Sequence, residues 1–188
     1  MKRILTGMLV AMLLLLGTGA AYTQANPAIA ENLKIVLIRH GEKPNTGDNL
    51  SCQGLNRAME LPKVLHTKFG VPDFTFVPSV KTGKSTSRAR MFQTVTPFAS
   101  QYNLTVNSKF AEEDYKGLTA HLLTKSGTIL LVWEHNAIKA IAAELGIKEH
   151  LKWPDSDFDS IWIITFPKGT ATLTKDKEGL NPSSDCKN

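Results

Sequence analysis

Cysteine is scarce in this sequence. Only Cys52 and Cys186 occur among the 188 residues, and neither has a Cys or His neighbour at metal-ligand spacing. This scarcity argues against a zinc site, and we expect no metal. Two interpretations of the cysteines stay open: a disulfide that pins the C-terminal end to the domain in an oxidising compartment, or two unrelated thiols.

Basic runs interleaved with aromatic residues are also missing, which argues against a nucleic-acid partner. The net charge is +5, and removal of Lys2 and Arg3 with an N-terminal leader would lower it by two. This modest basic balance suits an anionic substrate. Hydrophobic residues make up 42% and charged residues 21%, so a folded globular domain is expected.

The one long apolar run lies near the N-terminus. Lys2 and Arg3 precede apolar residues 8–16 and then small residues. This pattern predicts a signal peptide over residues 1–25, cleaved after Ala21 or Ala25, and a periplasmic or secreted protein. The rival is a retained anchor, but the run is shorter than the about 20 residues that span a bilayer. No stable membrane insertion is expected once the signal is removed.

Strand and helix patterns alternate through the rest of the chain. Such alternation predicts an α/β three-layer sandwich with a mainly parallel central sheet. The domain is expected over residues 33–175, followed by a loose polar tail over 176–188. Expected strands are 34–38, 74–77 and 128–133, a short extended piece at 104–106, and a closing hairpin of 160–166 with 170–174. Expected helices are 51–69, 87–101, 115–123 and 136–145.

Two histidines follow buried strands of this sheet. His40 comes after the first, and His135 comes just past the strand that ends at Trp133. Ligands of open α/β sheets bind outside the carboxyl ends of the strands. A histidine there can act as a nucleophile, and the neighbouring Arg39 has a planar fork that matches phosphate oxygens.

Four segments resemble a known family in the family's own order. Ile35-Val-Leu-Ile-Arg-His-Gly-Glu-Lys-Pro44 resembles the signature of the histidine phosphatase superfamily, which has the phosphoglycerate mutase-like fold. Residues 50–58 look like the segment that opens the family's first long helix. Residues 90–94 are similar to its second arginine motif, and residues 130–135 to the strand before its second histidine. The resemblance covers about residues 33–166.

This resemblance implies a phosphomonoesterase without a cofactor, and the signal-peptide pattern adds that it is exported. His40 would form a phosphohistidine, while Arg39, Arg90 and His135 would hold the phosphoryl oxygens. The substrate would be a phosphorylated small molecule or an envelope component. The alternative is a catalytically weak or inactive domain of the same fold that binds phosphorylated ligands.

Two assignments within the resemblance stay open. Arg88 competes with Arg90 for the phosphate, and the choice of Arg90 depends on its spacing to Thr94. For the general acid, Glu112 takes the position that some members use. The alternatives are no dedicated acid or one of three other carboxylates, namely Glu113, Asp114 and Glu134.

Three other patterns are given structural roles. Gly83-Lys84-Ser85 is interpreted as a basic loop near the site, because the earlier glycine of a phosphate-binding loop is missing. Residues 153–159 are expected to form a turn before a strand, with aspartates at the pocket edge. Packing or surface roles are expected for His66, His121 and His150.

Overall fold

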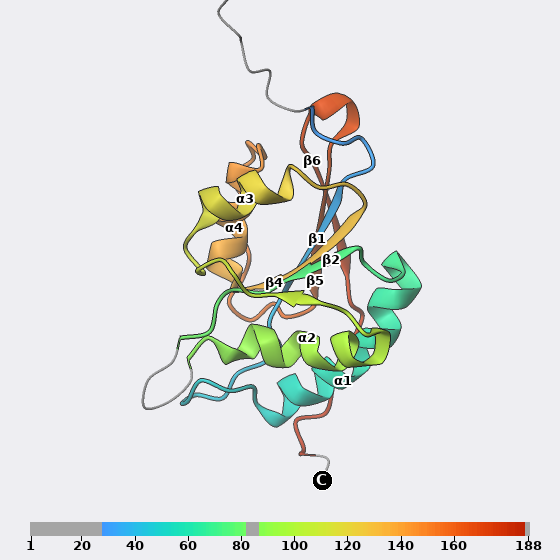
Figure 1. The fold of residues 1–188 in the computed structure, drawn as a ribbon. Coiled ribbons are helices and arrows are strands. Elements are labelled where there is room, and N and C mark those ends of the chain that lie inside the picture. The colour runs from blue at the N-terminus through green and yellow to red at the C-terminus, as the bar shows by residue number, and fades with distance from the viewer. Residues whose placement is uncertain (1–27, 82–86, 187–188) are drawn as a thin grey trace, which may run out of the picture.

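The computed structural model describes residues 28–81 and 87–186. Its elements form three layers, with a sheet between two pairs of helices (Figure 1). The predicted signal peptide and the Gly83-Lys84-Ser85 loop lie outside the described residues. Within the described residues, no helix is long and apolar enough to cross a membrane.

The central sheet has six strands in the order β3-β2-β4-β1-β5-β6. The first four strands along the chain pair in parallel, whereas β5 runs antiparallel to both β1 and β6. The predicted α/β sandwich with a mainly parallel sheet is therefore confirmed. The strands are β1 (Lys34–Arg39), β2 (Phe74–Phe76), β3 (Val106–Asn107), β4 (Thr128–Trp133), β5 (Ser160–Thr165) and β6 (Thr172–Lys177).

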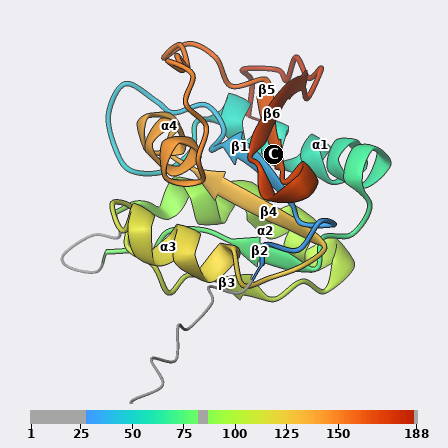
Figure 2. The same cartoon turned by 90° about the horizontal axis from the view of Figure 1, so that it is seen from above.

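Two helices cover each face of the sheet. Figures 1 and 2 show α1 and α2 on one face and α3 and α4 on the other. Pro62 and Pro97 are accommodated inside continuous helices. The helices are α1 (Cys52–Phe69), α2 (Ala89–Tyr102), α3 (Tyr115–Leu122) and α4 (His135–Glu144), and a short 3-10 turn, η1 (Pro167–Gly169), joins β5 to β6.

The core is divided by the sheet because successive strand residues face opposite sides. In β1, Val36 and Ile38 pack toward α1 and α2, whereas Ile35 and Leu37 pack toward α3 and α4. This two-sided burial explains why β1 is an unbroken apolar run.

The register of β1 on β4 determines where the two histidines lie. Arg39 pairs with Trp133, and the backbone N–H of His40 donates to the carbonyl of Trp133 at 3.1 Å. His40 thus lies directly after the carboxyl end of β1, beside the point where α4 begins with His135.

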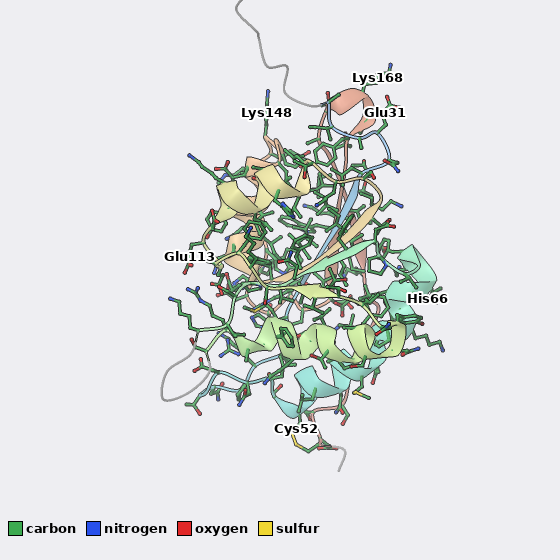
Figure 3. The ribbon with its side chains drawn as sticks, in the orientation of Figure 1. Glu31, Cys52, His66, Glu113, Lys148 and Lys168 are labelled. Carbon is green, nitrogen blue, oxygen red and sulfur yellow. A yellow bond between two sulfur atoms is a disulfide. The ribbon has the colours of Figure 1, made fainter. Side chains whose placement is uncertain are left out.

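The C-terminal segment is not the loose tail that its polar composition predicted. Strand β6 continues to Lys177, Glu178 is buried, and the following residues run along α1 to a disulfide between Cys186 and Cys52. Figure 3 shows this disulfide beside the C-terminal end of the chain. The prediction failed because Glu178 is buried as the partner of a buried arginine, which composition does not reveal.

Candidate active site

His40 presents one free ring nitrogen. The residue is 2% exposed, and its Nδ1 lies 2.7 Å from the carbonyl oxygen of Gly41. A carbonyl oxygen only accepts hydrogen bonds, so Nδ1 carries the proton of the neutral ring. The lone pair is therefore on Nε2.

The surroundings of His40 keep its ring neutral. Burial, together with the charges of Arg39, Arg90 and His135, lowers the pKa of His40 to about 3, against the opposing hydrogen bond to Gly41. Burial and like charges both disfavour the protonated form. His40 is thus a neutral base across weakly acidic and neutral pH.

The turn after His40 is attached to α2 and to α1. The N–H of Gly41 donates to Thr94 Oγ1 at 2.9 Å, and that hydroxyl donates to the carbonyl of Arg90 at 2.7 Å. A Cβ at Gly41 would lie 2.8 Å from the carbonyl oxygen of Gly54. Glycine is needed here because the backbones of the turn and α1 approach too closely for a side chain.

Arg39 is held by the turn before β5. It is 1% exposed, and its Nη1 donates to the carbonyls of Asp155 at 2.6 Å and Asp157 at 3.1 Å. Its guanidinium lies 3.9 Å from the centre of the Phe158 ring, a cation–π contact. The residue 153–159 turn thus orients Arg39 through main-chain carbonyls.

His135 begins α4 between two carboxylates. Its Nε2 donates to Asp155 Oδ1 at 2.7 Å, and its Nδ1 lies against Glu134 without hydrogen-bond geometry. Glu134 caps α4 by accepting from the N–H groups of Asn136 and Ala137. Glu134 is thus engaged as a helix cap.

Arg90 and Arg88 point to different partners. Arg90 donates to the carbonyl of Gly47 at 2.7 Å, and its charge is one of those that lower the pKa of His40. Arg88 precedes α2 at φ 62°, and its side chain pairs with Glu112 and Glu113 instead. This arrangement favours Arg90 as the arginine beside His40.

A pocket of about 290 Å³ opens over His40. It combines three cationic side chains with three acidic ones. Its lining residues are His40, Asp48, Lys81, Ser87, Arg88, Arg90, Met91, Glu112 and Glu134. A larger hollow of about 600 Å³ lies along β2 and β3 and contains none of the predicted site residues.

Solved structures share this arrangement of strands and helices. Comparison with protein-family models and with curated proteins found no match. Among solved structures, the protein histidine phosphatase SixA complexed with tungstate matches with a TM-score of 0.57 and 17% identity, over 77% of this chain and 97% of that one. This chain has the histidine phosphatase fold.

Two more structures of the histidine phosphatase fold match at similar levels. The phosphoserine phosphatase of Entamoeba histolytica in complex with 3-phosphoglyceric acid gives a TM-score of 0.52 at 16% identity, over 76% of this chain and 95% of that one. The mycobacterial glucosyl-3-phosphoglycerate phosphatase with inorganic phosphate gives 0.50 at 15% identity, with the same two coverages. The predicted phosphoglycerate mutase-like fold is therefore confirmed.

Within this histidine phosphatase fold, Glu112 differs from its neighbours Glu113 and Asp114. Glu112 is half-buried at the pocket, and burial raises its pKa against the opposing charge of Arg88. Glu113 is exposed (Figure 3), and its contact with Arg88 lowers its pKa. Asp114 caps α3 by accepting from the N–H of Gly117 at 3.0 Å. Glu112 therefore keeps a proton more readily than Glu113, while Asp114 is engaged as a helix cap.

The remaining histidines pack or face solvent. His66 stacks on Tyr102, and His121 contacts Phe76 and Phe110. His150 is exposed. Within residues 28–81 and 87–186, no group of three or more His, Cys, Asp or Glu side chains is placed to hold a metal ion.

Sequence reasoning gave no role to one buried ionic cluster next to the site. Arg57 lies between Glu42, two residues after His40, and Glu178 of the C-terminal segment. Arg57 and Glu42 lie in segments that resemble the family, so the sequence showed a basic and an acidic residue there without showing that they pair. Glu178 has no local signal, because only the folded chain brings it to Arg57.

Proposed function

We propose that this chain is an exported phosphomonoesterase that works through a phosphohistidine on His40. The observation that carries the proposal is the neutral ring of His40. Its Nε2 lone pair is free, and the guanidinium groups of Arg39 and Arg90, together with His135, act on it. Such a group can attack phosphorus while fixed positive charges stabilise the phosphoryl oxygens.

The reaction would proceed in two displacements. In the first, Nε2 of His40 forms a bond to phosphorus, the ester P–O bond breaks, and Glu112 gives its proton to the leaving oxygen. In the second, water attacks the phosphohistidine, Glu112 takes the proton from that water, and the P–N bond breaks to release inorganic phosphate. The raised pKa of Glu112 supports the role of proton donor.

The substrate we propose is a phosphorylated small molecule or an envelope component. Lys81 and Arg88 line the pocket beyond His40, so its wall is charged and polar. Structures of the same fold have been solved with tungstate, inorganic phosphate or 3-phosphoglyceric acid, which supports a phosphorylated ligand for this chain.

Export is supported by two independent features. The N-terminal sequence has the pattern of a signal peptide. The Cys52–Cys186 disulfide suits an oxidising compartment such as the periplasm or the exterior.

The central test compares the mature protein with His40→Ala on p-nitrophenyl phosphate. Loss of the nucleophile should reduce kcat by at least about 1000-fold. Acid-quenched wild type, but not the variant, should carry label from a ³²P-labelled phosphoester. Phosphate release by wild type no faster than by the variant from pH 4 to 8 would refute the proposal for simple monoesters. Binding of phosphate without turnover would instead favour a phospho-ligand-binding domain.

A further inference from the structure

The buried Arg57 joins two segments that are far apart in the sequence. It is 4% exposed, with Glu42 on one side and Glu178 on the other. Its Nε lies 3.1 and 3.0 Å from the two carboxylate oxygens of Glu42, and its Nη2 lies 2.7 Å from Oε1. Its Nη1 contacts Glu178 Oε2 at 2.5 Å. One guanidinium therefore holds both carboxylates through different nitrogens.

Glu42 belongs to the turn that carries His40. Its carbonyl accepts from the N–H and the hydroxyl of Ser51, at 2.9 and 3.1 Å. Gly54 packs against the same backbone, since a Cβ there would lie 2.3 Å from the Glu42 carbonyl oxygen. The side chain and the main chain of Glu42 are thus both fixed by the first two turns of α1. A shift of Glu42 would therefore move Gly41 and His40.

Glu178 belongs to the C-terminal segment, and this segment is attached to the domain at several points. Its N–H donates to the carbonyl of Asp159 at 2.7 Å. Further along, Asn56 of α1 donates to the carbonyls of Ser183 and Asp185 at 2.9 and 2.8 Å. The Cys52–Cys186 disulfide closes this path at the start of α1. The segment thus has several attachments to the helix that also carries Arg57.

Both contacts of Arg57 matter because the group is buried. Removal of one partner from a buried ionic cluster leaves charge without compensation, and the remaining groups rearrange. Without Glu178, Nη1 would have only Asp159, now 3.9 Å away, as a nearby carboxylate. If the guanidinium of Arg57 moved toward Asp159, its hydrogen bonds with the carboxylate of Glu42 would be strained and Glu42 would be displaced.

We propose that Glu178 is a positioning residue for the phosphate site. It holds Arg57, Arg57 holds Glu42, and Glu42 fixes the turn that carries His40, while the disulfide keeps the tail against α1. This inference rests on the proposed function for its kinetic readout only. A misplacement of about 1 Å can cost on the order of 100-fold in rate.

The test measures kcat and KM for p-nitrophenyl phosphate, and calorimetric binding of tungstate, in Glu178→Ala, Glu178→Gln and the control Asp176→Ala. Asp176 lies two residues earlier and also pairs with α1, through an exposed contact with Lys68 at 2.9 Å. Glu178→Ala should lower kcat at least about 10-fold and weaken tungstate binding. Asp176→Ala should match wild type. Glu178→Gln should stay within about 3-fold, because it keeps an acceptor for Arg57.

Rescue by glutamine is expected for a further reason. Burial raises the pKa of Glu178 against the opposing charge of Arg57, so the neutral acceptor glutamine avoids the cost of burying a second carboxylate beside Glu42. A purely structural role would lower the unfolding midpoint of Glu178→Ala while leaving kcat and tungstate affinity of the folded fraction unchanged. That result would overturn the proposal.

A second variant covers the case in which Glu178→Ala does not fold. Paired Cys52→Ser and Cys186→Ser substitutions remove the covalent attachment of the tail to α1 while Glu178 remains, and should also lower kcat and tungstate affinity. Unchanged values in this double variant, together with an unfolded Glu178→Ala, would count against positioning. If wild type hydrolyses no phosphoester, the proposed function fails by itself. The tungstate affinities of the same variants then decide whether Glu178 positions the site.

Discussion

The pKa values of His40 and Glu112 are shifted in opposite directions by the same physical cause. Burial disfavours charge, so it is the largest cause both of the lowered pKa of the imidazole, about 3, and of the raised pKa of the carboxyl. At weakly acidic pH the ring is therefore neutral, while Glu112 keeps its proton to higher pH than an exposed glutamate does. These are the two protonation states that attack and leaving-group protonation require.

This pairing predicts that phosphate release is faster at acidic than at alkaline pH. The rate of wild type should fall as rising pH removes the proton from Glu112, whereas protonation of His40 should reduce it only in strong acid. Glu112→Gln should abolish the alkaline fall and slow alkyl phosphates by about 100-fold or more, within the range for general acid catalysis. Aryl phosphates should be slowed much less, because their leaving groups need little protonation. Initial rates on glycerol phosphate and p-nitrophenyl phosphate from pH 4 to 9 measure both effects.

Glu113→Gln is the matched control for this prediction. Glu113 is exposed, and its pKa is lowered by Arg88, so it gives up its proton at lower pH than Glu112 and is the poorer donor. It should leave both the pH profile and the alkyl-to-aryl ratio unchanged. Equal slowing of alkyl and aryl phosphates in Glu112→Gln would remove Glu112 from the role of acid.

Sequence reasoning found the residues whose position follows from strand ends. Arg39, His40 and His135 come directly at or after buried strands, so the parallel sheet alone brings them to one edge. It chose Arg90 over Arg88 only by the spacing to Thr94, because the left-handed backbone that turns Arg88 toward Glu112 and Glu113 has no sequence signal. Among the acidic residues 112–114 it placed Glu112 first only through the family resemblance, since burial and helix capping distinguish them only in the folded chain.

At the scale of elements, the start of α1 and the turn after His40 pack backbone against backbone. A Cβ on Gly54 would lie 2.3 Å from the carbonyl oxygen of Glu42, and a Cβ on Gly41 would lie 2.8 Å from that of Gly54. Both contacts involve main-chain atoms, which cannot rotate away as a side chain can. The sequence predicted the helix from its apolar spacing, but nothing in that spacing reports this close approach.

We therefore expect Gly54→Ala to disturb both stability and activity. The added methyl should force α1 and the turn apart, which costs about 1–3 kcal/mol of unfolding free energy, as overpacking does. The displacement of His40 should also lower kcat. Urea unfolding and p-nitrophenyl phosphate kinetics measure the two effects.

The neighbouring residue offers a control on the same helix. Leu55 is 49% exposed, so Leu55→Ala should change the unfolding free energy by no more than about 0.5 kcal/mol. A Gly54→Ala variant as stable and active as Leu55→Ala would show that the helix and the turn can separate freely.

At the scale of the whole molecule, the C-terminal segment connects the last strand to the first helix. Strand β6 is the outer strand beside β5, yet residues after it return to α1 through Glu178, the carbonyls of residues 183 and 185, and Cys186. The sequence left the pairing of the cysteines open because spacing alone cannot place two ends of a chain together. Local patterns in the sequence predicted the order of helices and strands. The return of the C-terminal segment to α1 depends on where the folded sheet places the end of β6.

The disulfide closes a loop with a sequence separation of 134 residues, nearly the whole described domain. Such a link restricts the unfolded chain strongly, and native disulfides typically add about 2–4 kcal/mol. Paired Cys52→Ser and Cys186→Ser substitutions should therefore lower the unfolding free energy by about that amount, and Tm by about 5–15 °C. Thermal unfolding with and without dithiothreitol supplies the control. The reductant should bring wild type to the Tm of the double variant and leave the variant itself unchanged. Equal Tm values for the oxidised wild type and the double variant would show that the contacts of Glu178 and Asn56 hold the tail without the covalent link.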